Sequence, residues 1–93
     1  MITLANRITR RAATAGESTQ RDYLVLDLSS GRYFGLGEVG GFIWQRLDGS
    51  RDLAAIAAEV AEHFGVTAER ARADLLEFVA QLVDDGLAEV TGD

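Results

Sequence analysis

The clearest pattern in the sequence is an alternation of side chains over residues 23–28, which predicts a β-strand. A second apolar run, residues 32–36, follows the turn Ser29–Ser30–Gly31. If these three residues form the loop, with Gly31 in the left-handed conformation, both strands place their large apolar side chains on one face. We therefore expect three cross-strand pairs, namely Leu24 with Leu36, Leu26 with Phe34, and Leu28 with Arg32.

After Gly37 the apolar residues adopt helical spacing, and three helices are predicted. The first ends at Asp48–Gly49, and its buried stripe comprises Val39, Phe42, Ile43 and Leu47, with Trp44 as a flanking core residue. The second runs from an Asp52 N-cap to Gly65, with the stripe Leu53, Ile56, Ala57, Val60 and Phe64. The third runs from a Thr67 N-cap to Gly86, with the stripe Ala71, Leu75, Phe78, Val79 and Leu82.

The remaining segments carry weaker patterns. Residues Asn6–Thr14 favour a weak edge strand, Ala15–Gln20 a loop, and Leu87–Val90 a short extended tail. The order of elements predicts an α+β fold, in which a three-stranded antiparallel sheet is followed by three helices. At 93 residues we expect a single domain over 1–93, with an ordered core of about 6–90.

Composition narrows the functional classes. The chain has no cysteine, and its nine basic residues are all arginine against 15 acids, a net charge of −6. The charge is divided, because residues 1–21 carry +3 and residues 22–93 carry −9. General affinity for nucleic acids is therefore not expected. No apolar run is long enough for a membrane span or a signal peptide, so we expect a cytoplasmic protein without membrane association.

Candidate catalytic groups are few. His63 is the only histidine and lacks an evident partner, and the acids Asp84, Asp85 and Glu89 follow the pattern of a solvated face. Gly35, Gly37 and Gly40 match a dinucleotide-binding spacing, but they follow a hairpin rather than opening a parallel strand–helix unit. We expect no enzymatic activity, no catalytic residue, no metal and no cofactor.

The edge of the predicted sheet is the remaining candidate site. In a meander with residues 23–28 in the middle, the strand 32–36 has one partner and one free side. Its sequence, RYFGL, contains no proline or lysine to protect that side. Such an edge beside an amphipathic helix suits β-augmentation by a guest peptide. The alternative is that a helix or the C-terminal segment covers the edge.

Four stretches carry a resemblance to a known family: YLVLDLSSGRYFGL, GGFIWQRLDG, LAAIAAEVAEHFGV and ADLLEFVAQLVDDGLAEV. Together they resemble the PQQ-biosynthesis protein D-like family, also called RiPP recognition elements, over about residues 6–90. Within it the chain is most similar to the stand-alone leader-binding proteins of lasso-peptide biosynthesis. It departs from the family at Gly37, where asparagine is common, and near Val39, where threonine or serine is common, so we expect a less firmly capped first helix.

The resemblance implies a winged-helix-like fold and a binding function. The leader of a precursor peptide would add as an antiparallel strand to the third strand, against the third helix, and would be presented to a separate leader peptidase and cyclase. Carried over by position, the peptide-binding residues on the strand are Arg32, Tyr33, Phe34, Gly35 and Leu36. Those on the helix are Asp74, Leu75, Phe78 and Leu82.

Two other functions stay open. One is a leader-binding chaperone for a radical enzyme in PQQ-type biosynthesis, which is also implied by the resemblance. The other is a winged-helix DNA-binding regulator, which the order of elements permits. The charges disfavour it, because Arg70 and Arg72 of the predicted third helix stand among a larger number of acids.

Overall fold

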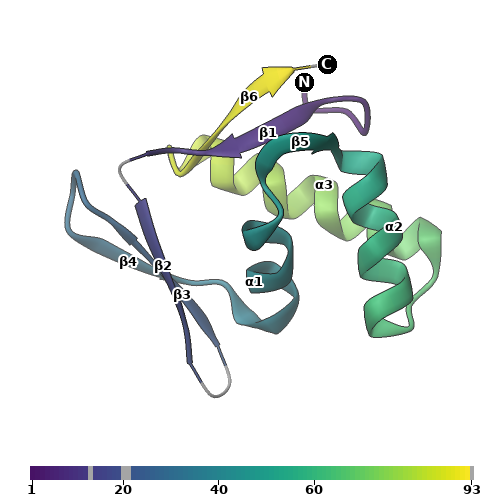
Figure 1. Ribbon diagram of the computed structural model, residues 1–93, viewed down its shortest axis with the longest axis horizontal. Coiled ribbons are helices and arrows are strands. Elements are labelled where there is room, and N and C mark those ends of the chain that lie inside the picture. Colours follow the sequence, from purple (N-terminus) through teal and green to yellow (C-terminus); the bar gives the residue numbers. More distant parts are fainter. Residues whose placement is uncertain (13, 20–21, 93) are drawn as a thin grey trace.

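Three helices and two antiparallel sheets form the fold, which confirms the α+β class (Figure 1). The structure is a computed structural model that describes residues 1–12, 14–19 and 22–92. The first sheet has the order β5-β1-β6 and comprises β1 (Arg7–Arg10), β5 (Asp48–Asp52) and β6 (Ala88–Gly92). The second has the order β2-β3-β4 and comprises β2 (Thr14–Ser18), β3 (Tyr23–Asp27) and β4 (Arg32–Gly35). The helices are α1 (Gly37–Gln45), α2 (Leu53–Phe64) and α3 (Ala68–Asp84).

The first sheet lies along the helices and corrects the expectation of an edge strand over Asn6–Thr14. Strand β1 is shorter than predicted and is the middle strand of its sheet. Thr9 pairs with Asp48 of β5, and Ile8 pairs with Val90 of β6, so the predicted extended tail is a paired strand. Both partners are distant in sequence, and the polar segment Asp48–Asp52 has no local strand pattern that would reveal this pairing.

The second sheet is the predicted meander with a different first strand and a different register. Residues 14–18 form β2, so the loop predicted over Ala15–Gln20 is wrong for 15–18, while Gln20 and Ala13 lie outside the described residues. Between β3 and β4 the observed pairs are shifted by one residue from those predicted. They are Leu24 with Gly35, Val25 with Phe34, Leu26 with Tyr33, and Asp27 with Arg32.

Asp27 explains the shift, because it closes a four-residue loop over residues 28–31. Its carboxylate accepts hydrogen bonds from the Ser29 amide and the Ser30 hydroxyl, both at 3.0 Å. Its carbonyl accepts from the Gly31 amide at 2.8 Å, and Gly31 has the expected positive φ of 74°. Leu28 therefore lies in the turn and is 58% exposed, whereas Val25 is fully buried. The odd-numbered face of β3, not its leucine face, packs on the core.

The second and third helices follow the sequence prediction closely. The Asp52 carboxylate accepts from the Ala55 amide at 2.9 Å, and the Thr67 hydroxyl accepts from the Arg70 amide at 3.2 Å, which confirms both N-caps. Gly65 ends α2 in the left-handed conformation with φ of 66°. Most of the predicted stripe residues are buried, and the two phenylalanines are partly buried.

The start of α1 is held by Asp22, the residue that directly precedes β3. Leu36 at the N-cap makes no side-chain hydrogen bond, as the weak capping pattern predicts. Instead, Asp22 Oδ1 accepts from the Gly37 amide at 2.6 Å and from the Tyr23 amide at 2.7 Å. This carboxylate fixes α1 against β3 and so sets the position of the β4–α1 connection. The helix ends at Gln45, before Leu47, and Val39 is 41% exposed rather than part of a buried stripe.

The hydrophobic core lies between the helices and the first sheet. Trp44 is 2% exposed, which confirms it as a core residue, and Ile8, Leu53 and Leu75 are equally buried. From the second sheet only Val25 is fully buried. None of the helices described by the structure is both long and apolar enough to cross a membrane.

Candidate functional site

Strand β4 is the edge of the second sheet, and it pairs only with β3 among the described residues. The Leu36 amide donates to the Tyr23 carbonyl at 2.9 Å. Hydrogen-bonded and non-hydrogen-bonded pairs alternate in an antiparallel ladder, so Phe34 also directs its amide and carbonyl toward β3. It follows that Tyr33 and Gly35 direct theirs away from the sheet. The free edge thus offers the main-chain groups of two residues to a further strand.

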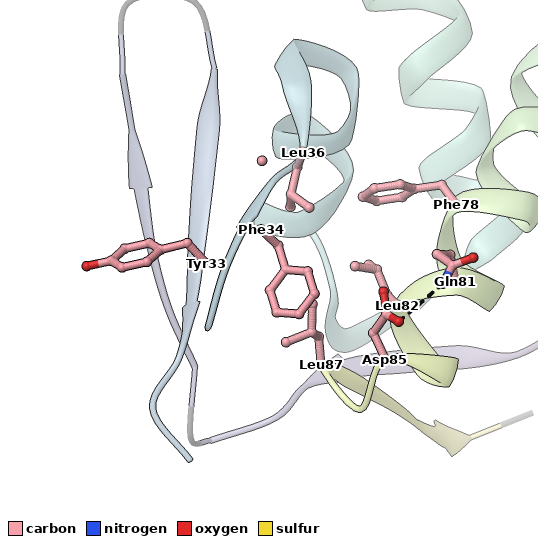
Figure 2. Close-up of a pocket in the computed structure, with 9 residues that line it drawn as sticks. Tyr33, Phe34, Leu36, Phe78, Gln81, Leu82, Asp85 and Leu87 are labelled. Atoms are coloured by element: carbon pink, nitrogen blue, oxygen red, sulfur yellow. Dashed lines mark hydrogen bonds between the residues drawn. The ribbon is translucent and has the colours of Figure 1, made fainter. Parts of the chain in front are cut away.

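A pocket of about 460 Å³ lies between this strand and the C-terminal half of α3. We call it the β4–α3 pocket, and its lining residues are Tyr33, Phe34, Gly35, Leu36, Phe78, Gln81, Leu82, Asp85 and Leu87. In Figure 2 the side chains of Phe34, Leu36 and Phe78 point into it, whereas the Tyr33 ring points away on the other side of the strand. The interior of the pocket is therefore apolar, and the main-chain edge runs along its rim.

Six of the nine residues carried over from the family line this pocket: Tyr33, Phe34, Gly35, Leu36, Phe78 and Leu82. The other three do not. Arg32 lies beside it, with its guanidinium carbon 4.9 Å from the centre of the Phe34 ring. Leu75 is fully buried in the core, and Asp74 is exposed and paired with Arg70 at 3.4 Å.

Three lining residues were missed from the sequence. Gln81 and Asp85 lie one turn apart at the polar rim, and the Gln81 amide nitrogen donates to Asp85 Oδ1 at 3.2 Å. Leu87 is fully buried and lies against the pocket because α3 ends in a Schellman motif. In that motif Gly86 has φ of 76°, and the Leu87 amide donates to the Leu82 carbonyl at 2.9 Å. A glycine followed by leucine at a helix end was the signal available for Leu87.

The chemistry of the site is that of a binding surface. Its polar elements are main-chain amides and carbonyls, the Tyr33 phenol and the Gln81–Asp85 pair, and its interior is hydrocarbon. Within the described ranges, no group of three or more histidine, aspartate or glutamate residues is arranged to hold a metal ion. An extended peptide matches this arrangement, since main-chain bonds supply affinity and a pocket for alternate side chains supplies specificity.

One known protein family matches this sequence over most of its length. The model of the family described as coenzyme PQQ synthesis protein D (PqqD) matches residues 22–88, which span β3 to the start of β6. The chain belongs to the PqqD family. The matched segment of this PqqD-like chain includes β4, α3 and every residue that lines the β4–α3 pocket.

Two solved structures are similar to this PqqD-like chain over nearly its whole length. One is TbiB1 in complex with the TbiA(beta) leader peptide, with 26% identity, a TM-score of 0.79, and coverage of 91% of this chain and 99% of that one. The other is a lasso peptide synthetase B1 complexed with the leader peptide, with 25% identity, a TM-score of 0.78, and coverage of 89% and 98%. Among curated proteins, none matches the sequence.

Proposed function

We propose that this chain is a non-enzymatic recognition subunit for the leader of a ribosomally made precursor peptide in lasso-peptide biosynthesis. The leader adds as an antiparallel strand to the free edge of β4, against α3. The observation that carries the proposal is the outward direction of the main-chain groups of Tyr33 and Gly35 beside the β4–α3 pocket. The two similar structures support it, because each holds a leader peptide.

The binding energy requires both the edge and the pocket. Pairing with Tyr33 and Gly35 allows up to about four main-chain hydrogen bonds, each worth about 1 kcal/mol net. Micromolar affinity needs about 8 kcal/mol, and association carries additional ordering costs. Apolar leader side chains buried against Phe34, Phe78 and Leu82 supply the remainder, at about 25 cal/mol per Å² of apolar surface.

Bound in this way, the leader is presented to a separate leader peptidase and cyclase. The chain acts by raising the effective concentration of the precursor near these enzymes, so that weak affinity for the rest of the precursor is sufficient. The expected partners are therefore the leader and, transiently, the two enzymes, in the cytoplasm. No nucleic acid or membrane takes part.

A second candidate is a leader-binding chaperone for a radical enzyme in PQQ-type biosynthesis, which the description of the matched family favours. The genes beside this one separate the two functions. A short precursor with a transglutaminase-like peptidase and a cyclase supports the lasso assignment, and a radical enzyme supports the PQQ assignment.

The edge itself is tested by two variants at one position. Tyr33→Pro removes an outward amide, whereas Tyr33→Ala removes the ring and keeps the amide. We expect fluorescence anisotropy with the labelled leader of the neighbouring precursor to show binding about tenfold weaker for Tyr33→Pro than for Tyr33→Ala. Circular dichroism confirms that both variants are folded.

Two results would contradict the proposal. One is that the folded parent protein binds no leader below about 100 μM. The other is equal affinity in the proline and alanine variants, which would move the binding site away from this edge.

A further inference from the structure

The second sheet has an exposed apolar face on the side opposite the β4–α3 pocket, and we call it the outer face. The register places two rows across it, Ala15–Leu26–Tyr33 and Glu17–Leu24–Gly35. Tyr33 is 70% exposed, and Leu24 and Leu26 are only partly buried. A shallow pocket of about 290 Å³ runs along these rows. The outer face reaches the free edge of β4, so a strand added there would extend both rows.

Gly35 leaves a gap in this face at the free edge. A Cβ atom placed on Gly35 would lie 3.9 Å from Leu24 Cδ2 and 3.0 Å from Asp22 Oδ2. Because Gly35 has no side chain, the side of Leu24 that faces the free edge of β4 is not covered by a neighbour in its row. We call this position the Gly35 gap. Glycine inside a strand often marks a place where a ligand or another backbone comes close.

An added strand would fill the gap with one of its own side chains, a step that rests on the proposed function. The guest residues opposite Tyr33 and Gly35 form hydrogen-bonded pairs, and their side chains lie on the outer face. The guest residue between them points into the β4–α3 pocket. Opposite Gly35 the guest side chain has no neighbour of its own size, so it can lean across the gap onto Leu24. Aromatic side chains are known to stabilise edge glycines in this way.

The charges around the gap restrict what it accepts. Asp22 Oδ1 is held by the amides of Tyr23 and Gly37, which directs Oδ2 to the gap. Glu17 stands at the other end of the same row. A carboxylate on the guest at this position would face like charges across the sheet, which is unfavourable.

We propose that the Gly35 gap is a specificity subsite, in which the guest residue opposite Gly35 carries a large side chain that is not acidic, best an aromatic one, packed on Leu24 beside Tyr33. In an antiparallel guest this residue directly precedes the one in the β4–α3 pocket. The recognised segment thus contains two consecutive large side chains that point to opposite faces of the sheet. Acidic residues are excluded from the first of these positions.

The test uses a display library of peptides with eight randomised residues, selected on the purified full chain. We expect the selected peptides to share an aromatic residue followed directly by a second apolar residue, with no acid at the first position. Replacing that aromatic residue by alanine should weaken binding to the parent protein about tenfold, which corresponds to about 1.4 kcal/mol. With Gly35→Ala or Leu24→Ala, which fill the gap or remove its floor, the same replacement should cost less than about threefold. Leu26→Ala, in the neighbouring row, is the matched control and should keep the tenfold difference.

The outcomes separate the subsite from the function. One outcome is that the selected peptides bind, and bind more weakly to Tyr33→Pro, but show no preference for a large side chain at the first position. This outcome rejects the Gly35 gap as a subsite and leaves the proposed function intact. An unchanged tenfold difference in both gap variants rejects it as well. Failure of any extended peptide to bind rejects the proposed function and the subsite together.

Discussion

The two sheets of this small protein have opposite relations to the core. In the β5-β1-β6 sheet, Ile8 is 1% exposed, and the residues that precede β6 and follow β5, Leu87 and Leu53, are fully buried. In the β2-β3-β4 sheet only Val25 is fully buried, and the sheet extends away from the helices in Figure 1. We therefore expect the first sheet to contribute most of the sheet-derived stability. The second sheet can leave an edge and a face exposed because the core between the first sheet and the helices stabilises the fold.

The largest expected effect tests this division with one residue from each sheet. Ile8→Ala removes a buried side chain from the middle strand of the first sheet and should lower the free energy of unfolding by about 2–5 kcal/mol. Leu26→Ala, on the outer face of the second, should lower it by less than about 1 kcal/mol. Urea denaturation measures both. If both variants lost the same free energy of unfolding, the outer face would be buried in solution, which would contradict its exposure in the structure.

A smaller effect is expected in the β4–α3 pocket. Phe78→Ala removes the largest side chain that α3 contributes to the pocket and should weaken leader binding by about 1–3 kcal/mol, or roughly fivefold to 150-fold. Gln81→Ala, at the polar rim one turn away, is the control and should change affinity less than threefold, about 0.6 kcal/mol. Isothermal titration calorimetry gives both values. If Gln81→Ala proved the more damaging change, recognition would depend on the rim rather than on the apolar interior.

The smallest effect concerns the first sheet at low pH. The Ser50 hydroxyl and amide donate to Asp48 at 2.6 and 2.9 Å, and these bonds hold the pKa of Asp48 below its ordinary value of 3.8. A lowered folded-state pKa stabilises the fold above the unfolded pKa, and this contribution is lost as the pH falls through the folded value. Asp48→Asn should therefore flatten the decline in melting temperature between about pH 5 and pH 3, with leader affinity at neutral pH unchanged. A steeper decline of the melting temperature in Asp48→Asn than in the parent protein would contradict the lowered pKa of Asp48.

The sequence was most informative where structure depends on neighbouring residues. The caps at Asp52 and Thr67 and the stripes of α2 and α3 follow from local periodicity and hydrogen bonding, and the structure confirms them. The strands β5 and β6 depend on partners far along the chain, and their sequences carry no strand pattern strong enough to reveal them. Residues 15–18, predicted as a loop, form most of β2, because their small and polar side chains carry no strand pattern.

The register error shows how a local signal can outweigh a hydrophobic pattern. Three leucines at alternate positions suggested the buried face of β3, yet that face is the outer one. The side chain of Asp27 fixes a longer turn, and aspartate is well suited to bond its own backbone two residues on. For the site, the strand residues followed from the family resemblance and the exposed edge. The rotation of α3, which buries Leu75 and turns Gln81 and Asp85 to the rim, required the packed structure.

Hydrogen–deuterium exchange at three consecutive amides tests the central claim most directly. In the free protein we expect the Phe34 amide to exchange slowly, because it bonds to β3, and the amides of Tyr33 and Gly35 to exchange rapidly. On addition of saturating leader, the amides of Tyr33 and Gly35 should become protected, with Phe34 little changed. A leader that binds tightly while both outward amides still exchange rapidly would contradict the addition of a strand to this edge.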